Sequence, residues 1–289
     1  MSYFDFSAHS IKTLADADCT RALQEDVGTG DLTAGLIDPQ RVVKAYILAR
    51  ESATVCGIPW VNAAIQQLTP DARIDWLITE GAVCQPNQTI VHMQGPAQAL
   101  LTAERTALNF LQLLSGVATK TAQYVHAVAE VPNNRSQIVD TRKTIPGLRL
   151  AQKYAVRIGG GTNHRIGLFD AILIKENHIA AAGGVTTALE RAQAQAGQAK
   201  FIEIEVETLD QLQEALSSGA KMVLLDNMTL AQMHQAVAIN AGRAILEVSG
   251  GVNLSTVRDI AATGVDRISI GGLTKDVQAI DFSMRFEDL

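Results

Sequence analysis

The 289-residue sequence has only three cysteines, Cys19, Cys56 and Cys84, an odd number without the spacing of a metal-binding motif. No apolar run approaches the ~20 residues of a membrane-spanning helix, and the first residues lack the basic and apolar regions of a secretory signal. The formal net charge is −6 and no basic stripe follows the chain. These absences predict a cytoplasmic protein with reduced thiols that binds neither nucleic acid nor membranes.

The composition is that of an ordinary globular protein, with 47% apolar and 19% charged residues. A chain of this length is expected to form one large or two medium domains. Residues 1–115 mix short strands with helices. The patterns predict helices at 10–25, 59–68 and 101–117, the last with Thr102 as its N-cap, and strands at 42–50, 53–56, 74–79 and 89–93.

A regular alternation of apolar strands and amphipathic helices begins near residue 137 and predicts parallel βα units. Strands are expected at 137–141, 171–174, 201–206, 222–225, 244–248 and 267–270, and helices at 148–156, 185–196, 209–217, 230–239 and 254–262. Six strands are too few for an eight-fold barrel. We therefore expect a smaller or open α/β barrel, with 282–286 as one more strand that returns to the first domain.

Polar or glycine residues follow every strand of this second half, where parallel α/β barrels build their active sites. In order they are Arg142 and Lys143, Lys175, Glu205, Asp226, Ser249 with Gly250 and Gly251, and Gly271 with Gly272. The two glycine pairs fit either a phosphate-binding site, in which backbone N–H groups are accessible, or two ordinary turns.

Positive charge is concentrated between Asp140 and His178. This segment contains seven Lys and Arg residues and three Asp and Glu residues, which gives a net charge of +4. Such a concentration is costly unless an anion neutralises it, so this segment predicts a site for a small, highly charged anion.

Two carboxylates at neighbouring strand ends, Glu205 and Asp226, can hold Mg²⁺, contact sugar hydroxyls or stabilise a developing cation. Glu203 shares a strand face with Glu205, and Glu207 follows in the turn, so the pattern leaves the assignment within this cluster open. Arg105, on or beside the apolar stripe of helix 101–117, is on the pattern alone a charge paired across a domain seam.

Eight motifs in one order resemble the quinolinate phosphoribosyltransferase family, also called carboxylating nicotinate-nucleotide pyrophosphorylase, over nearly the whole chain. They are EDVGTGD at 25–31, ERTALN at 104–109, DTRKT at 140–144, GGTNHR at 160–165, LIKENH at 173–178, EIEVE at 203–207, LDN at 225–227 and EVSG at 247–250.

The resemblance implies an α/β protein, with an N-terminal α/β sandwich (1–115), a C-terminal open α/β barrel of about six parallel strands (116–275) and a tail (276–289) that returns to the first domain. It implies a homodimer that converts quinolinate and phosphoribosyl pyrophosphate into nicotinate mononucleotide, pyrophosphate and CO2 with Mg²⁺, a step of de novo NAD biosynthesis.

The resemblance also implies residue roles. Arg142, His164 and Arg165 would contact quinolinate, and Lys143 and Lys175 the charged groups of both substrates. Glu205 and Asp226 would lie by the ribose and the metal, which they reach directly or indirectly. Ser249, Gly250, Gly271 and Gly272 would bind the 5′-phosphate, and Arg105 would reach the quinolinate of the partner subunit. Catalysis would rest on Lys143, Lys175, Glu205 and Asp226.

Three other functions are compatible with these residues. One is a Schiff-base lyase on the same barrel with Lys175 as its nucleophile. Another is an anion-binding or regulatory protein without turnover. The third is a paralogous phosphoribosyltransferase that acts on another aromatic acid.

Overall fold

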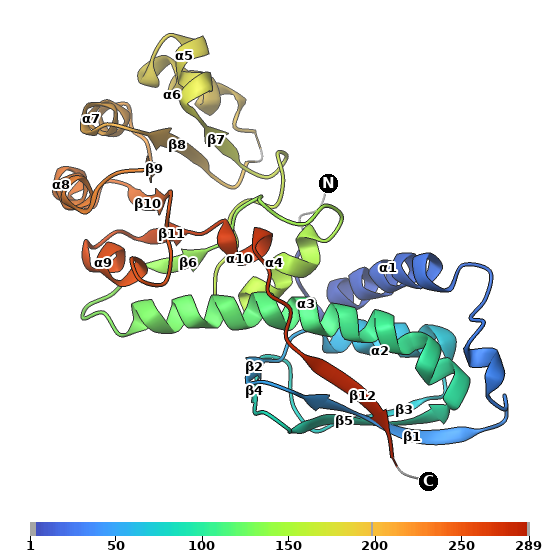
Figure 1. The fold of residues 1–289 in the computed structure, drawn as a ribbon. Coiled ribbons are helices and arrows are strands. Elements are labelled where there is room, and N and C mark those ends of the chain that lie inside the picture. The colour runs from blue at the N-terminus through green and yellow to red at the C-terminus, as the bar shows by residue number, and fades with distance from the viewer. Residues whose placement is uncertain (1–3, 198, 288–289) are drawn as a thin grey trace. The chain divides into compact units, whose positions relative to one another are not determined.

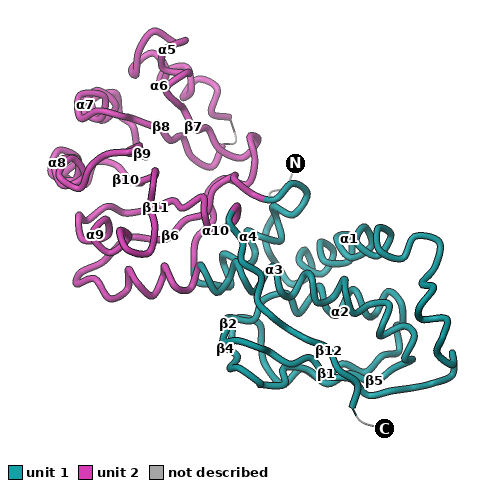
Figure 2. Tube along the Cα trace, in the orientation of Figure 1, with its two compact units in different colours: residues 1–120, 145–160, 276–289 teal, residues 121–144, 161–275 magenta. Residues whose placement is uncertain are grey.

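The computed structural model describes residues 4–197 and 199–287, which form two compact units (Figures 1 and 2). The first unit comprises Met1–Lys120, Ile145–Gly160 and Asp276–Leu289, and the second comprises Thr121–Thr144 and Gly161–Lys275. The units therefore interleave along the sequence. Helix α3 (Ala97–Ala129) begins in the first unit and ends in the second.

The first unit contains an antiparallel four-stranded sheet in the order β12-β1-β5-β3. Alternate residues of β1, among them Val43, Ala45 and Ile47, are buried, as expected for a strand with one face on a core. The strands are β1 (Val42–Ala49), β3 (Arg73–Trp76), β5 (Thr89–Pro96) and β12 (Phe282–Phe286), beside a short pair of β2 (Ala53–Thr54) and β4 (Val83–Cys84). The tail strand β12 pairs with β1 in antiparallel orientation.

Four α-helices of the first unit lie on one side of this sheet (Figure 1). They are α1 (Ala8–Val27), α2 (Ile58–Leu68), α4 (Arg149–Ile158) and the first part of α3, and a 3₁₀ turn, η1 (Ala34–Leu36), precedes β1. Helix α1 packs against α2 and α4. The indole Nε1 of the fully buried Trp60 donates to Asp18 Oδ2 over 2.9 Å, which joins α1 to α2.

The start of α2 depends on the close approach of Gly57 to the backbone of α3 and on hydrogen bonds to the side chain of Glu80. Gly57, with φ of +119°, precedes the helix, and a Cβ at this position would lie 3.2 Å from Leu111 Cα. Glu80 accepts hydrogen bonds from the backbone N–H groups of Gly57 (2.8 Å) and Ile58 (3.0 Å). A carboxylate from a distant loop therefore satisfies the N–H groups that the helix cannot satisfy itself.

The second unit contains six parallel strands in the order β6-β11-β10-β9-β8-β7. Among the described residues β6 and β7 do not pair with each other, which confirms the predicted open arrangement. Each helix between residues 176 and 262 contacts the next helix along the chain. The strands are β6 (Gln137–Val139), β7 (Ile172–Ile174), β8 (Ile202–Val206), β9 (Met222–Asp226), β10 (Ile245–Ser249) and β11 (Arg267–Ser269).

The helices of this unit mostly fall where the periodicity predicts them. They are α5 (Glu176–Ala182), α6 (Val185–Gln195), α7 (Leu209–Ser217), α8 (Leu230–Asn240), α9 (Val257–Ala262) and α10 (Gly272–Lys275). Helix α9 starts at Val257 and not at residue 254 as predicted. The backbone N–H of Ser255 donates to Asn253 Oδ1 over 3.0 Å, and this hydrogen bond holds residues 253–255 in a turn before the helix.

Three predictions for the helices are wrong. Thr102 is not an N-cap, because α3 begins at Ala97 and the Thr102 hydroxyl contacts Gln98 O (2.9 Å) and Asp31 Oδ2 (2.8 Å). The helix also continues to Ala129, well beyond residue 117. The helix after the first parallel strand, α4, belongs to the first unit and contacts α1, so it is not part of the unit that contains the parallel sheet.

None of the helices in residues 4–197 and 199–287 has the length and apolarity that crossing a membrane requires.

Replacing Glu80 with Ala should destabilise the protein by about 1–3 kcal/mol, because two N–H groups at the start of α2 lose their acceptor. Urea denaturation measures the change. Asp75→Ala is the control, since its ion pair with Arg73 is exposed and its loss should cost well under ~1 kcal/mol. Equal denaturation midpoints for the two variants would contradict this role of Glu80.

Candidate functional site

A cavity of about 280 Å³ opens at the carboxyl ends of the parallel strands of the second unit. The loop after β6 contributes two cations, the ends of β7 and β8 contribute Lys175 and Glu205, and β10 and β11 contribute hydroxyl groups. The lining residues are Thr141, Arg142, Lys143, His164, Arg165, Leu173, Lys175, Glu205, Leu224, Glu247, Ser249 and Ser269. The structure thus brings together seven of the residues that the sequence singled out.

The other five predicted residues do not line this cavity. Asp226, Gly250, Gly271 and Gly272 lie at or just after the ends of β9, β10 and β11. Arg105 is exposed on α3 in the first unit, where it lines a different hollow together with Glu25, Asp26 and Leu148.

Two guanidinium groups form the most positively charged part of the cavity. Burial lowers the pKa of Arg165, and the positive charge of Arg142 lowers it further. The Arg165 side chain donates from Nη1 to Ala171 O over 3.3 Å. Arg142 Nε is buried and has no hydrogen-bond partner within the described part of the chain. Two cations that repel each other, one with an unused donor, favour an anion with several oxygen acceptors.

The lysines reach the cavity from two sides. Lys175 Nζ, on a side chain that is 47% exposed, lies 3.0 Å from Glu205 Oε2, and the Glu205 side chain is 11% exposed. The Lys143 carbonyl accepts from Thr274 Oγ1 over 2.7 Å. The Lys143 side chain crosses Gly271, where an added Cβ would lie 2.8 Å from Lys143 Cδ. Gly271 therefore leaves room for the lysine side chain.

Asn227 connects the ends of β9 and β10. Its Nδ2 donates to Asp226 Oδ2 (2.7 Å) and its backbone N–H to Ser249 O (3.2 Å), with a φ of +53°. Gly250 has a φ of +99°, and a Cβ there would overlap Asn227 Oδ1. Glycine is therefore required at this strand end both by conformation and by space.

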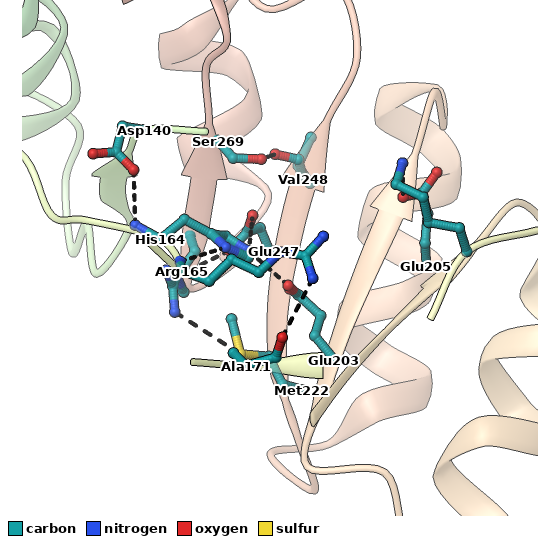
Figure 3. A network of polar contacts seen from close by, with 12 residues as sticks. Asp140, His164, Arg165, Ala171, Glu203, Glu205, Met222, Glu247, Val248 and Ser269 are labelled. Carbon is teal, nitrogen blue, oxygen red and sulfur yellow. Dashed lines mark hydrogen bonds and ion pairs between the residues drawn. The ribbon is translucent and has the colours of Figure 1, made fainter. Parts of the chain in front are cut away.

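A buried polar cluster includes two residues that line the cavity, His164 and Glu247 (Figure 3). His164 Nε2 lies 2.7 Å from Glu203 Oε2 and 3.5 Å from Glu247 Oε1, and Arg267 Nε lies 3.0 Å from Glu247 Oε2. The side chains of Glu203 and Glu247 are fully buried. The structure thus distinguishes the glutamates of β8: Glu205 lines the cavity, whereas Glu203 does not.

The sequence patterns did not reveal this cluster. They predicted no role for Glu247 or Arg267 and left Glu203 open as an alternative to Glu205. The available signal was the occurrence of acidic residues inside two apolar strands, which is unusual unless they are paired.

His164, Glu203 and Glu247 offer ligand atoms within 4.8 Å of one another, a donor set that could bind a metal ion. The guanidinium of Arg267, however, already lies against Glu247 and supplies positive charge to the cluster. Its position fits a salt-bridged structural cluster better than a metal centre.

Burial raises the pKa of both buried glutamates to about 7. For Glu247 the charge of Glu203 raises the pKa further, while His164 and Arg267 lower it. The desolvation of the carboxylate therefore outweighs the nearby cations.

The stability that Glu247 contributes should be pH-dependent. Its folded-state pKa of about 7 exceeds the ordinary value of 4.5, so the folded state binds more protons between these values. The contribution is therefore full below about pH 4.5 and is lost as the pH rises to about 7. Glu247→Gln should gain stability relative to the wild type over this range, by up to about 1.4 kcal/mol for each unit of the pKa difference.

Urea denaturation of both proteins across this pH range measures the difference. Glu207→Gln is the control, because Glu207 is an exposed carboxylate directly after strand β8 of the same sheet. A stability difference between wild type and Glu247→Gln that stays constant with pH would contradict the prediction.

Two family models match the chain in order. The model for the N-terminal domain of quinolinate phosphoribosyl transferase matches residues 31–115, and the model for its C-terminal domain matches residues 117–285.

Individual proteins are similar over the same extent. A probable carboxylating nicotinate-nucleotide pyrophosphorylase of Bacillus subtilis is 39% identical over 260 residues, which cover 90% of this chain and 89% of the relative. The carboxylating nicotinate-nucleotide pyrophosphorylase of Mycobacterium leprae is 40% identical over 271 residues, which cover 91% and 94%. The solved structure of the nicotinate-nucleotide pyrophosphorylase of Francisella tularensis superposes with a TM-score of 0.93 at 41% identity, and covers 99% of this chain and 100% of that one.

The two matched domains together span almost the whole chain, and the similarity to the relatives extends through the strands and loops that build the cavity. The chain belongs to the quinolinate phosphoribosyl transferase family.

Proposed function

We propose that this protein is a pentosyltransferase that converts quinolinate and phosphoribosyl pyrophosphate into nicotinate mononucleotide, pyrophosphate and CO2, in de novo NAD biosynthesis. The observation that carries the proposal is the pair of guanidinium groups, Arg142 and Arg165, that face one small cavity at the strand ends. Quinolinate has two adjacent carboxylates, and planar guanidinium groups bind carboxylates through paired hydrogen bonds. The two arginines offset the two negative charges of this substrate.

The second substrate is also a polyanion, so its approach to quinolinate needs further positive charge. Lys143 and Lys175 supply this charge beside the arginines. We assign them to the charged groups of both substrates. The ends of β10 and β11, with Ser249, Gly250, Gly271 and Gly272, are assigned to the 5′-phosphate. The backbone conformation at Gly250, with φ of +99°, supports an accessible N–H there.

The carboxylates at the ends of β8 and β9 suit the reacting sugar. As pyrophosphate leaves C1 of the ribose, positive charge develops on the ring, and Glu205 and Asp226 at adjacent strand ends can stabilise it. When the pyridine nitrogen has taken the ribose, its positive charge accepts the electrons that remain at C2 as CO2 leaves. The protein then needs to orient the pyridine ring, and no nucleophilic side chain is required.

Mg²⁺ is the cofactor of the proposed reaction. Glu205 and Asp226 are oxygen donors of the kind that Mg²⁺ prefers, and each already has a partner within the protein, Lys175 and Asn227. This arrangement fits a metal that is carried by the substrate phosphates and reached by the two carboxylates through water. When bound, the metal neutralises charge on the leaving pyrophosphate.

We propose a homodimer in which Arg105 reaches the quinolinate of the partner subunit. The exposed position of Arg105 on α3 of the first unit, and its absence from the lining of the second unit's cavity, support this assignment. We also propose the domain bounds 1–115 and 116–275, with 276–289 returning to the first domain. The β12–β1 pairing supports the return of the tail, and the first family model ends at residue 115 and the second begins two residues later. Residues 145–160 of the second domain belong to the first compact unit.

A cytoplasmic location is supported by three free, buried thiols.

Product analysis tests the proposed reaction. Incubation with quinolinate, phosphoribosyl pyrophosphate and Mg²⁺ should yield nicotinate mononucleotide by mass spectrometry and an equal amount of CO2. Nicotinate in place of quinolinate is the control and should give no product, because it lacks the second carboxylate.

Other outcomes would support the alternatives. Turnover of nicotinate would favour a paralogous phosphoribosyltransferase. Borohydride trapping of Lys175 with a carbonyl substrate would favour a lyase. Tight quinolinate binding without turnover at saturating Mg²⁺ would favour a binding protein.

Mixed dimers test the assignment of Arg105. Arg105→Ala and Arg142→Ala should each abolish most activity with little effect on folding. If Arg105 acts in trans, a random mixture of the two variants contains heterodimers with one intact site, and about a quarter of the wild-type activity should return. The control mixture, Arg142→Ala with Arg165→Ala, should stay inactive because both residues belong to the same cavity. No recovery in the first mixture would show that the trans assignment is wrong.

A further inference from the structure

His164 is held by protein groups through both nitrogens of its ring. Its Nδ1 lies 2.7 Å from the backbone nitrogen of Arg165. A backbone N–H can only donate, so Nδ1 must offer its lone pair and cannot carry a proton. This contact fixes one ring nitrogen as an acceptor for the residue that follows in the chain.

The other ring nitrogen then carries the proton. His164 Nε2 lies 2.7 Å from Glu203 Oε2, which accepts from it, and 3.5 Å from Glu247 Oε1 (Figure 3). A neutral imidazole has one N–H, and here it is directed at a fully buried carboxylate. The hydrogen bonds thus select one neutral tautomer, and they leave only the ring carbons of His164 for the cavity.

The position of the ring is fixed from further directions. The backbone N–H of His164 donates to Asp140 Oδ1 over 2.9 Å, and the ring contacts Phe201 edge to face at 5.3 Å between centroids. The residue as a whole is 8% exposed. A side chain held in this way has little freedom to turn a nitrogen toward a ligand.

The group that this arrangement positions is Arg165. Its backbone N–H is bound to the His164 ring, and its guanidinium lies in the cavity, where it repels Arg142. Repulsion between the two guanidinium groups opposes the geometry that a dicarboxylate needs. A rigid backbone anchor resists this repulsion before the substrate arrives.

We propose that His164 is a positioning residue for Arg165 and not a ligand of quinolinate: as a neutral imidazole with its proton on Nε2, it connects the buried carboxylate of Glu203 to the Arg165 backbone. Glu203, Glu247 and Arg267 form the buried support of the imidazole. The inference rests on the proposed function only for the choice of quinolinate as the probe.

The tautomer can be measured in the wild-type protein without any assay of activity. In a sample with ¹⁵N-labelled histidine, the ring resonances of His164 are assigned by their loss in His164→Gln, and the five other histidines serve as references. We expect Nδ1 of His164 to have the shift of an unprotonated nitrogen, both free and with saturating quinolinate. Two protonated nitrogens, or an Nε2 hydrogen bond that moves from Glu203 to quinolinate, would overturn the proposal.

Binding measurements test whether His164 acts through Arg165. His164→Asn keeps an acceptor near Nδ1 but loses the donor to Glu203, and His164→Gln keeps a donor near Nε2 but loses the acceptor for Arg165. Each should weaken quinolinate binding by about 10- to 100-fold in calorimetry, the size expected for a lost hydrogen bond in a charged setting. Each should raise KM for quinolinate more than it lowers kcat.

A double-mutant cycle separates positioning from direct binding. In an Arg165→Ala background, His164→Asn should cause little further loss of quinolinate affinity, because the group that it positions is absent. The same substitution in a Lys175→Ala background is the control and should retain its full effect, because Arg165 and its repulsion by Arg142 both remain. Independent, additive losses in the Arg165→Ala background would show that His164 binds quinolinate itself. Thermal unfolding of each variant confirms that the compared proteins are folded.

Discussion

Charge balance at the carboxyl ends of the parallel strands is the constraint on which the second unit depends. Arg142 and Arg165 repel each other at the cavity, and the side chains of Glu203 and Glu247 are fully buried in the same unit. A buried charge is tolerated only when it is paired, so neither pair is stable by itself. The carboxylate of Glu247 therefore lies against the guanidinium of Arg267.

The fold was predictable where a single local pattern decides the structure. Residues 209–217 and 222–225 lie in elements almost identical to those predicted, because each buries one apolar stripe or a fully buried strand. The failures involve residues whose partners are distant in sequence. Helix α4 follows a parallel strand, so the pattern made it an ordinary crossover helix, but it packs against α1. Nothing within 148–156 shows which of two apolar surfaces it will cover.

The sequence allowed about one site residue to be predicted for each parallel strand. The position of a side chain just after a strand identified Arg142, Lys175 and Glu205, which do line one cavity. The two-residue period of a strand places Glu203 and Glu205 on the same face but cannot assign their depth. Depth follows from the register with β9, in which Glu205 is opposite Leu224, and register is set by long-range pairing. For the same reason Glu247 and Arg267 could not be recognised as partners.

The charged groups at the strand ends are positioned largely by backbone atoms and small residues of neighbouring loops. Gly271 leaves room for the Lys143 side chain, Asn227 and Gly250 fix the strand end that bears Asp226, and the His164 ring binds the Arg165 backbone. Long cationic side chains lose much conformational entropy when a ligand orders them. If they are already ordered by buried contacts, that cost falls on folding rather than on binding. The buried cluster of His164, Glu203, Glu247 and Arg267 therefore orders the cavity as well as filling the core.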